Sequence, residues 1–514
     1  MNPVRFPKLG EVIQFIFDAL GVLPRKNDDD ASFDETRKKS IQKALQRLVL
    51  EEGALEQRLG EMAQTLSYLV AGTIQPRECL ALGDILSDLF EMYQHTLRDE
   101  GTFLTKSDSV KWFLLSSAAL RLPISVAKHL QRYNVAADCL VTPADIYWYL
   151  PTKGPDGWIW PLEKVMRWAY QMAGISAQKF HCPDGADQSI QEQNYGNAKN
   201  WLAGRNLPSW PTLLKNFNQS FDVLDQRQAE PNCPLLSENQ KNSIRMALFA
   251  ARAATYISKS VLAHQGDAVL QEFCLRYDIV ANCVIEDVQK IRDCAQRIIT
   301  EKNIPLSEQD GLWEAICTDY WRQFSENQHA VNQALVDKRI TNAEAVDVAR
   351  GFGLLTVLPF EKPEAFAPQH SIPEGFSEAI FDGFALRKIP NLSIDKIEKY
   401  AARLDDCGLS HVLPWMVPWQ KATYHYRAKR YEDAYPFIQD AFEKAQYCAG
   451  RNQYLLLNKY IELAAKNDKR RDFKRGIEWA TYLGFEVRWL RQDEPTDENL
   501  QFVYEIMRKA VYTD

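Results

Sequence analysis

A polar stretch between residues 191 and 200 carries the side chains best suited to contact another molecule. Amides of this kind can form two hydrogen bonds with the edge of adenine, and lysine can approach the acceptor atoms of guanine. Further basic residues follow, at a distance that suits contacts with a phosphate backbone. The candidate DNA-binding residues are Gln191, Gln193, Asn194, Asn197, Lys199, Asn200, Arg205 and Lys215.

Residues 162–217, which contain this stretch, resemble the DNA-binding helix-turn-helix of the Cro and repressor superfamily. In that family the recognition helix ends in a core tryptophan, a terminating glycine follows, and a Pro-Ser pair opens the next helix. Trp201, Gly204, Pro208 and Ser209 match these places. The resemblance implies a recognition helix before Trp201 that reads duplex DNA. The alternative is an ordinary helical hairpin in which Trp201 serves the core.

Local backbone chemistry agrees with helix ends at these positions. Gly204 tolerates the left-handed backbone that ends a helix, and Ser209 can cap the next helix with Pro211 in its first turn. Upstream, the sequence from Gly174 to Ser176 resembles the turn between the first two helices of the family. The second helix should end at Phe180, because a proline and a glycine follow it.

Helical patterns extend over most of the chain. Ser237 with Gln240 and Thr341 with Glu344 have the spacing of capping boxes. A third box at Ser32 opens a run of apolar residues at helical spacing that reaches Val70. Alternating patterns typical of strands are nearly absent. We therefore expect an all-α protein.

Three breaks rich in proline divide the chain into five predicted units. The breaks lie at residues 151–161, 226–234 and 359–390. The third also carries five phenylalanines, which favours an ordered but irregular connector packed against a domain. The units are an N-terminal helical unit (1–150), a helix-turn-helix-like unit (151–230), a central helical unit (231–358), a Pro-rich connector (359–391) and a C-terminal helical unit (392–514).

Residues 419–445 resemble a tetratricopeptide repeat. The match rests on small and large residues at the expected places, namely Ala422, Tyr431, Ala434, Ile438 and Ala441. A weaker second copy follows 42 residues later, with Phe473 in place of Tyr431 and Gly476 in place of Ala434. The resemblance implies stacked helical hairpins that receive a protein partner. The alternative is a helical bundle with no binding role.

The residues that could support catalysis or metal binding are scattered. No two of the eight histidines have the i, i+4 spacing of a metal site on one helix, and no two cysteines form a CxxC pair. Gly351 and Gly353 superficially suggest a phosphate loop, but the third glycine is missing. We predict a protein that is not an enzyme and that uses neither a cofactor nor a metal.

Composition sets further limits. The 514 residues carry a net charge of -7, so the whole chain is not a polycation that coats nucleic acid. No run of eighteen apolar residues predicts a membrane span, and the scattered cysteines suit the reducing cytoplasm. Two hypotheses remain: a cytoplasmic regulator that binds DNA and a protein partner, or a non-enzymatic helical scaffold without DNA binding. The sequence leaves the oligomeric state open.

Overall fold

The computed structural model describes residues 9–22, 43, 76–133 except 101, 103 and 105, 148–182 except 156, 188–226, 236–366, 371–490 and 496–509. Helices dominate these residues, and the strands among them form a single two-stranded hairpin. The all-α fold class is therefore confirmed. The predicted helix from Ser32 to Val70 lies outside the described residues.

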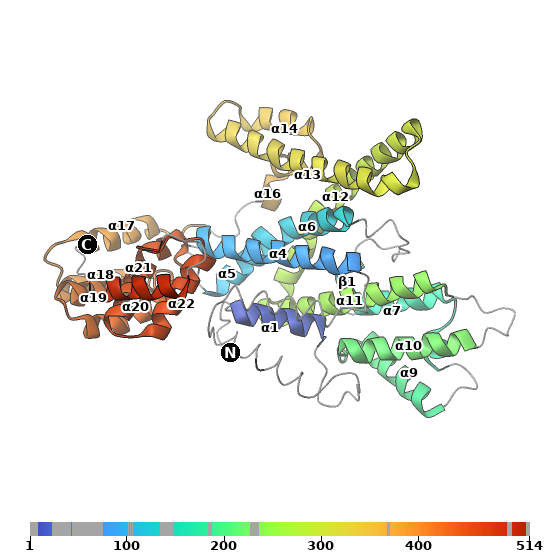
Figure 1. Ribbon diagram of the computed structural model, residues 1–514, viewed down its shortest axis with the longest axis horizontal. Helices are drawn as coiled ribbons and strands as arrows, with labels where there is room; N and C mark the ends of the chain where they lie inside the picture. Colours follow the sequence, from blue (N-terminus) through green and yellow to red (C-terminus); the bar gives the residue numbers. More distant parts are fainter. Residues whose placement is uncertain are drawn as a thin grey trace.

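Three groups of helices make up the described chain (Figure 1). The central group contains α1 (Leu9–Leu20), α4 (Pro76–Asp99), α5 (Lys106–Trp112), η1 (Phe113–Ala118), α6 (Ala119–Arg132), α7 (Pro161–Met172), α8 (Ala177–His181), α9 (Gln188–Leu202), α10 (Trp210–Gln226) and α11 (Glu238–Gln265). The projecting arm contains α12 (Asp267–Lys302), α13 (Leu306–Val336), α14 (Asn342–Arg350), α15 (Leu354–Glu361) and α16 (Pro363–Phe366). The C-terminal stack contains α17 (Phe376–Lys388), α18 (Ile394–Asp406), α19 (Met416–Arg427), α20 (Tyr431–Ala445), η2 (Gly450–Asn452), α21 (Gln453–Lys466), α22 (Arg470–Tyr482) and α23 (Asp497–Lys509).

An apolar helix formed by α5, η1 and α6 crosses the central group. Its middle is a π-helical turn, and buried Arg276 of α12 donates to the carbonyl of Leu115 there at 3.4 Å. By length and composition, the segment Asp108–Arg132 is apolar enough to cross a membrane, with a mean hydropathy of 1.3, but core helices pass the same test. It packs against α4, α12 and α13, and only Arg121 and Arg132 of this segment are exposed. We interpret it as a core helix.

The first predicted break is a short β-hairpin. Strand β1 (Thr152–Gly154) pairs antiparallel with β2 (Gly157–Ile159), so no helix crosses this segment, as predicted. Trp158 on β2 donates to the carboxylate of Asp267 at 2.8 Å. The hairpin is therefore fixed to the start of the long helix α12.

Both predicted capping boxes within the described chain are confirmed. Ser237 and Gln240 exchange hydrogen bonds at the start of α11, and Thr341 and Glu344 do so at the start of α14. The helical chain that begins with α11 is interrupted at Gly266, where φ is 86°. That left-handed residue separates α11 from α12 and redirects the chain into the arm.

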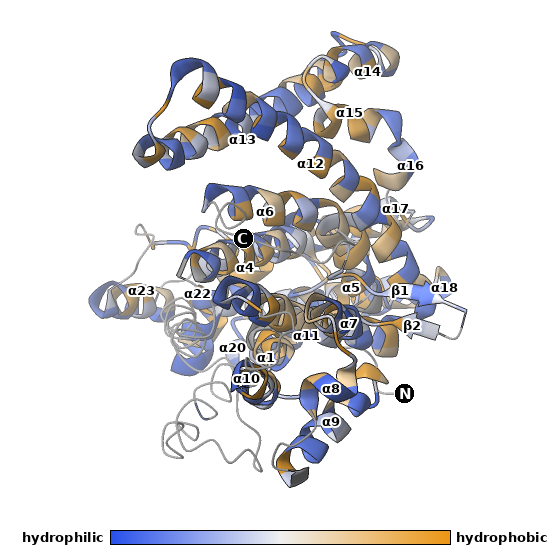
Figure 2. Ribbon diagram, turned by 90° about the vertical axis from the view of Figure 1, so that its right-hand side faces the viewer, coloured by the Kyte–Doolittle hydropathy of each residue, from blue (hydrophilic) through white to orange (hydrophobic). Residues whose placement is uncertain are grey.

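A buried carboxylate connects three helices of the projecting arm, α12, α13 and α15. Asp287 of α12 accepts hydrogen bonds from the phenol of Tyr320 on α13 at 3.1 Å and from the backbone amide of Leu355 at 3.2 Å. The second contact places a negative charge at the N-terminus of α15, where the helix dipole favours it. The glycine-rich sequence around Gly353 therefore holds a carboxylate of its own chain, at the place where a phosphate loop would hold phosphate. Figure 2 shows the outer faces of α12 and α13 as largely hydrophilic.

The predicted irregular connector at 359–391 is wrong in its local structure. Pro359 lies inside α15, α16 follows, and residues 376–388 form the regular helix α17. Pro363 opens α16, and Pro373 and Pro390 lie between helices, where a missing amide donor costs little, whereas Pro359 is accommodated inside α15. At Gly383 of α17, an added Cβ would lie 2.7 Å from the sulfur of Met416 on α19. That close approach makes α17 part of the C-terminal stack.

The hairpins of the C-terminal stack share one turn geometry. Lys429 and Asp468 both have left-handed backbone, with φ of 58° and 56°, and lie 39 positions apart. Each donates its amide to the carbonyl three residues earlier. The structural repeat is therefore 39 residues, and the predicted spacing of 42 is wrong. The spacing of 42 aligns Tyr431 with Phe473. The turns instead place Ala434 and Phe473 at equivalent positions of successive hairpins.

Small residues permit the close packing predicted for this stack. Ala422, Ala434 and Ala441 are fully buried between α19, α20 and α21. At Gly476 an added Cβ would lie 2.6 Å from Cγ1 of Ile461, which shows how closely α22 approaches α21. Because the alternating helices are joined by short turns, every second connection lies at the same end of the stack.

One hydrophobic core joins the central group to the C-terminal stack. It contains Tyr93 and Leu97 of α4 together with residues from α7, α10, α11 and α17–α23. At the junction, the side chain of Gln453 donates to the carbonyl of Leu97 at 3.1 Å, and Ser109 donates to the carbonyl of Tyr447 at 3.3 Å. The N-terminal and C-terminal parts of the chain therefore share one hydrophobic core.

Candidate nucleic-acid interface

The candidate interface is built on α9, which lies with α10 at the end of the molecule opposite the C-terminal stack (Figure 1). Helix α7 leads into a turn at Gly174, where φ is 67°. Ser176 then caps α8 by accepting a hydrogen bond from the amide of Lys179 at 3.3 Å. Helix α8 ends at His181, one residue beyond the predicted end. The local helix ends thus follow the sequence signals.

Helix α9 presents two different faces. Gln191, Asn194, Ala198 and Trp201 recur at helical spacing and are all buried. Residues between these positions are exposed or half-exposed. Trp201 is therefore a core residue at the end of α9, as both sequence interpretations required.

Two predicted site residues point into the protein. Gln191 is 5 % exposed and Asn194 is 8 % exposed. Asn194 donates to the side-chain oxygen of Gln219 at 2.9 Å, and its backbone carbonyl accepts from Asn216 at 3.0 Å. These contacts hold α9 against α10. The predicted DNA-binding role of Gln191 and Asn194 is therefore wrong, because the helix turns them toward its own core.

The remaining six predicted residues reach the surface. Gln193, Lys199, Arg205 and Lys215 are exposed, and Asn197 and Asn200 are half-exposed. None of these cations, nor Lys179 on α8, forms an ion pair with a carboxylate in the described part of the chain. Glu192 is the one acidic residue among residues 177–182 and 188–215, the parts of this segment that the structure describes. We call the exposed set on α9 and its flanks the outer face of α9.

The C-terminal end of α9 is fixed by a lysine that the sequence did not single out. Gly204 has φ of 63°, which confirms the predicted left-handed end, and the amide of Arg205 donates back to the carbonyl of Asn200 at 3.0 Å. Lys259 of α11 donates to the carbonyl of Gly204 at 2.7 Å and lies over the ring of Trp160. Burial lowers the pKa of Lys259. Lys259 thus fixes the C-terminal end of α9 to α11.

A buried polar chain lies beneath α8. Nε2 of His181 is 2.9 Å from the phenol oxygen of Tyr170 on α7, and its Nδ1 is 2.9 Å from the hydroxyl of Ser220 on α10. His181 is fully enclosed, and burial lowers its pKa to about 3. The imidazole is therefore neutral at pH 7. Because no part of it reaches solvent, it links three helices and is not accessible to a substrate.

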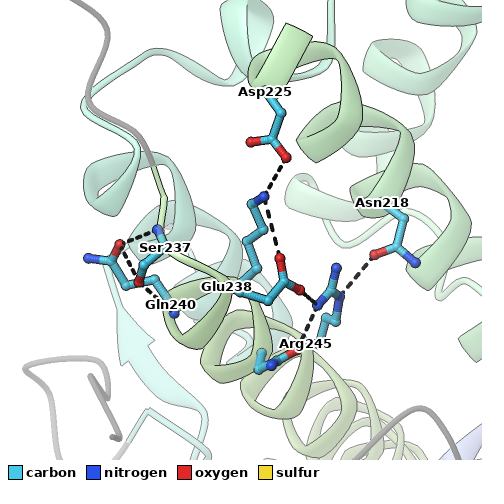
Figure 3. A network of polar contacts seen from close by, with 8 residues as sticks. Asn218, Asp225, Ser237, Glu238, Gln240 and Arg245 are labelled. Atoms are coloured by element: carbon cyan, nitrogen blue, oxygen red, sulfur yellow. Dashed lines mark hydrogen bonds and ion pairs between the residues drawn. The ribbon is translucent and has the colours of Figure 1, made fainter. Parts of the chain in front are cut away.

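A second polar network joins α10 to α11 (Figure 3). Lys241 pairs with Asp225 at 2.5 Å, and Arg245 donates to Glu238 at 2.8 Å and to Asn218 at 2.9 Å. Arg245 holds the pKa of Glu238 below its usual range. Figure 3 shows these side chains converging between the two helices. The network gives α10 a fixed support on the side of α11.

Groups suited to metal binding are not assembled in the described residues. No three histidine, cysteine, aspartate or glutamate side chains there are close enough to hold a metal ion. His95 lies 3.6 Å from Asp99 and 3.3 Å from Glu100, at the junction between α4 and the C-terminal stack. These contacts place two carboxylates beside a partly exposed histidine.

Comparison with known proteins gives no relative for this chain. Neither a protein-family model, nor a curated protein, nor a solved structure matches it.

Proposed function

We propose that this protein is a cytoplasmic regulator that binds duplex DNA through the outer face of α9 and a protein partner through the C-terminal stack. The observation that supports DNA binding is the composition of that face. It exposes amides next to lysine and arginine side chains that have no carboxylate partner in the described chain. A helix of this kind suits the major groove, which admits one α-helix.

The residues divide into two roles in this proposal. Lys199, Arg205 and Lys215 contact phosphates and supply affinity that falls with salt. Gln193 and Asn197 contact base edges, where amides prefer adenine. Helix α9 is held in place by α7, α8 and α11. The helix therefore does not have to fold or reorient before it binds DNA. No catalytic step, cofactor or metal enters the proposal.

The test is fluorescence anisotropy with a mixed-sequence duplex and the full chain between 50 and 200 mM salt. Replacing three cations in the variant Lys199→Gln, Arg205→Gln and Lys215→Gln should lower the slope of log affinity against log salt by roughly 2–3, because each phosphate contact contributes about 0.9. The matched control replaces three exposed cations of α12, Arg292→Gln, Arg297→Gln and Lys302→Gln, and should leave the slope unchanged.

The alternative is a non-enzymatic helical scaffold that binds proteins and no DNA. A wild-type chain without measurable affinity for duplex DNA at 50 mM salt contradicts the regulator and favours this alternative. Deleting the C-terminal stack cannot separate the two, because the stack shares its core with α4. Point substitutions on exposed residues are therefore the appropriate variants.

A further inference from the structure

Three turns of the C-terminal stack lie side by side at one end. Arg427, at the end of α19, donates to the carbonyls of Arg387 and Ile389, each at 2.6 Å, in the turn that follows α17. Asn467, at the end of α21, donates to the carbonyl of Tyr431 at 3.0 Å, at the start of α20. These contacts join the three connections into one surface. We call residues 387–396, 427–433 and 466–474 the turn edge.

The turn edge is basic in an otherwise acidic chain. Its three segments contain eleven basic and five acidic residues, whereas the net charge of the whole chain is -7. Some of its cations are paired, such as Arg470 with Asp468 and Lys474 with Asp497, both at 3.9 Å. Each turn contains at least one exposed lysine that forms no ion pair with a described carboxylate, and we consider the first such lysine of each turn. These lysines are Lys388, Lys429 and Lys469.

The positions of these lysines follow from the repeat. Lys429 occupies the left-handed residue of its turn, and Lys469 follows the equivalent residue of the next turn. Lys388 is the last residue of α17. The helix dipole favours cations at carboxyl ends, which suits Lys388 at the end of α17 and Lys429 just beyond α19, whereas Lys469 stands at the N-cap of α22. The result is at least one accessible lysine in each of the three turns.

The turn edge lacks the features of a protein-binding hot spot. Protein interfaces depend on large apolar or aromatic side chains that enter a pocket of the partner. No large hydrophobic residue of the turn edge is exposed. The exposed aromatics of the stack lie elsewhere, at Phe381 of α17, Tyr454 at the start of α21, Trp489 after α22 and Phe502 of α23. A surface that offers charge without apolar anchors suits a phosphate backbone better than a peptide.

We propose that the turn edge binds the phosphate backbone of duplex DNA without reading its sequence. It is a second contact surface, at the end of the molecule opposite α9 (Figure 1). The choice of DNA as the polyanion rests on the proposed function. The surface itself rests on the three turns, which share no residue with the outer face of α9. In this proposal the turn edge contacts only phosphates and positions the duplex, whereas the outer face of α9 contacts both phosphates and base edges.

The experiment compares three triple variants of the full chain by fluorescence anisotropy with a mixed-sequence 30-base-pair duplex. The turn-edge variant is Lys388→Gln, Lys429→Gln and Lys469→Gln. Its salt slope should fall by roughly 2.7, which corresponds to about fortyfold less weakening between 50 and 200 mM salt. The α12 variant of the preceding section should bind as wild type does. Circular dichroism checks that all variants keep their helices.

The outcomes separate the two proposals. A turn-edge variant that keeps the wild-type slope, while the α9 variant loses its own, overturns the turn edge and leaves the reading helix in place. The reverse result supports the turn edge and contradicts the proposed function. A wild-type chain that binds a poly-glutamate peptide but no duplex at 50 mM salt overturns the inference in favour of an acidic protein partner. Binding of neither overturns it as well.

Discussion

The two ends of this molecule present similar charges on surfaces that are held in different ways. Beneath α9, buried polar groups join the helices, including His181 between Tyr170 and Ser220 and the Lys241 network between α10 and α11. In the C-terminal stack, the closest helix contacts occur at small residues such as Gly476 and Gly383. The buried, neutral His181 should make the first region sensitive to pH, and the close approaches at Gly476 and Gly383 should make the second sensitive to side-chain volume.

The largest expected effect comes from Arg252 of α11. This buried guanidinium donates to the carbonyl of Asp18 at 2.6 Å and to that of Pro208 at 2.9 Å, and it also contacts the carbonyl of Ala19. It thereby joins the end of α1 to the start of α10. Arg252→Leu should destabilise the protein by about 3–4 kcal/mol, because buried carbonyls lose a charged donor. Urea denaturation followed by circular dichroism measures this loss.

The control for this substitution is Arg297→Leu on the exposed face of α12. We expect a change within about 0.5 kcal/mol there, as for most surface positions. A loss below about 1 kcal/mol for Arg252→Leu would show that the polar contacts of the α9 end contribute little, and the comparison between the two ends would fail.

An effect of intermediate size comes from the pH dependence of His181. Burial lowers its pKa to about 3, whereas an unfolded histidine has a pKa near 6.5. As the pH falls below 6.5, the unfolded chain gains a proton that the folded chain refuses, so the free energy of unfolding decreases. The loss should reach roughly 2 kcal/mol between pH 6.5 and pH 5. Urea titrations of wild type and His181→Gln at both pH values test it, since the variant lacks this loss.

His425 on α19 provides the matched position at the other end. Burial is the largest cause that lowers its pKa too, but its ring is partly exposed and Asp433 opposes the shift. Wild type and His425→Gln should therefore differ much less in their pH dependence. Equal effects at the two histidines would contradict the assignment of pH sensitivity to the α9 end.

The smallest effect comes from two glycines that should respond in opposite directions. Gly476→Ala adds a Cβ at 2.6 Å from Ile461 and should destabilise the stack by about 1–2 kcal/mol. Gly196→Ala, on the outer face of α9, meets no atom within 4 Å and should stabilise its helix by about 0.5–1 kcal/mol. Urea denaturation of the pair measures both signs. Two changes of the same sign would show that packing does not distinguish these regions.

Local signals in the sequence predicted helix ends well. The capping boxes at Ser237 and Thr341 and the left-handed end at Gly204 occur where the local sequence placed them, and the turn expected at Gly174 is present. These features depend on a few neighbouring residues. The prediction of an irregular connector is wrong because the prolines do not stop helices there: Pro359 lies inside α15, and Pro363 begins α16.

The candidate site was predictable only in part, for a geometric reason. The polar stretch was found, but sequence alone did not fix the rotation of α9, which turns Gln191 and Asn194 inward. The sequence does not distinguish a buried, hydrogen-bonded Asn or Gln side chain from an exposed one. Lys259 was missed because its contact with Gly204 joins residues 55 positions apart. Of the turn edge, the basic run at residues 466–475 is visible in the sequence as a possible addition to a nucleic-acid surface or as a solvated corner between helices. Its proximity to the other two turns is not visible, because turn geometry and not residue identity carries the 39-residue repeat.

The junction between α4 and the C-terminal stack has a consequence for synthesis. Leu97 is covered by residues such as Gln453, which are translated 356 positions later. At typical elongation rates of about 5–20 residues per second, the end of α4 waits roughly 20–70 s for its covering partner. During that interval its apolar side chains stay open to solvent and to other nascent chains. If the ribosome pauses before the last hairpins are made, the apolar side chains of α4 stay exposed for longer. Aggregation of the nascent chain is then most favoured.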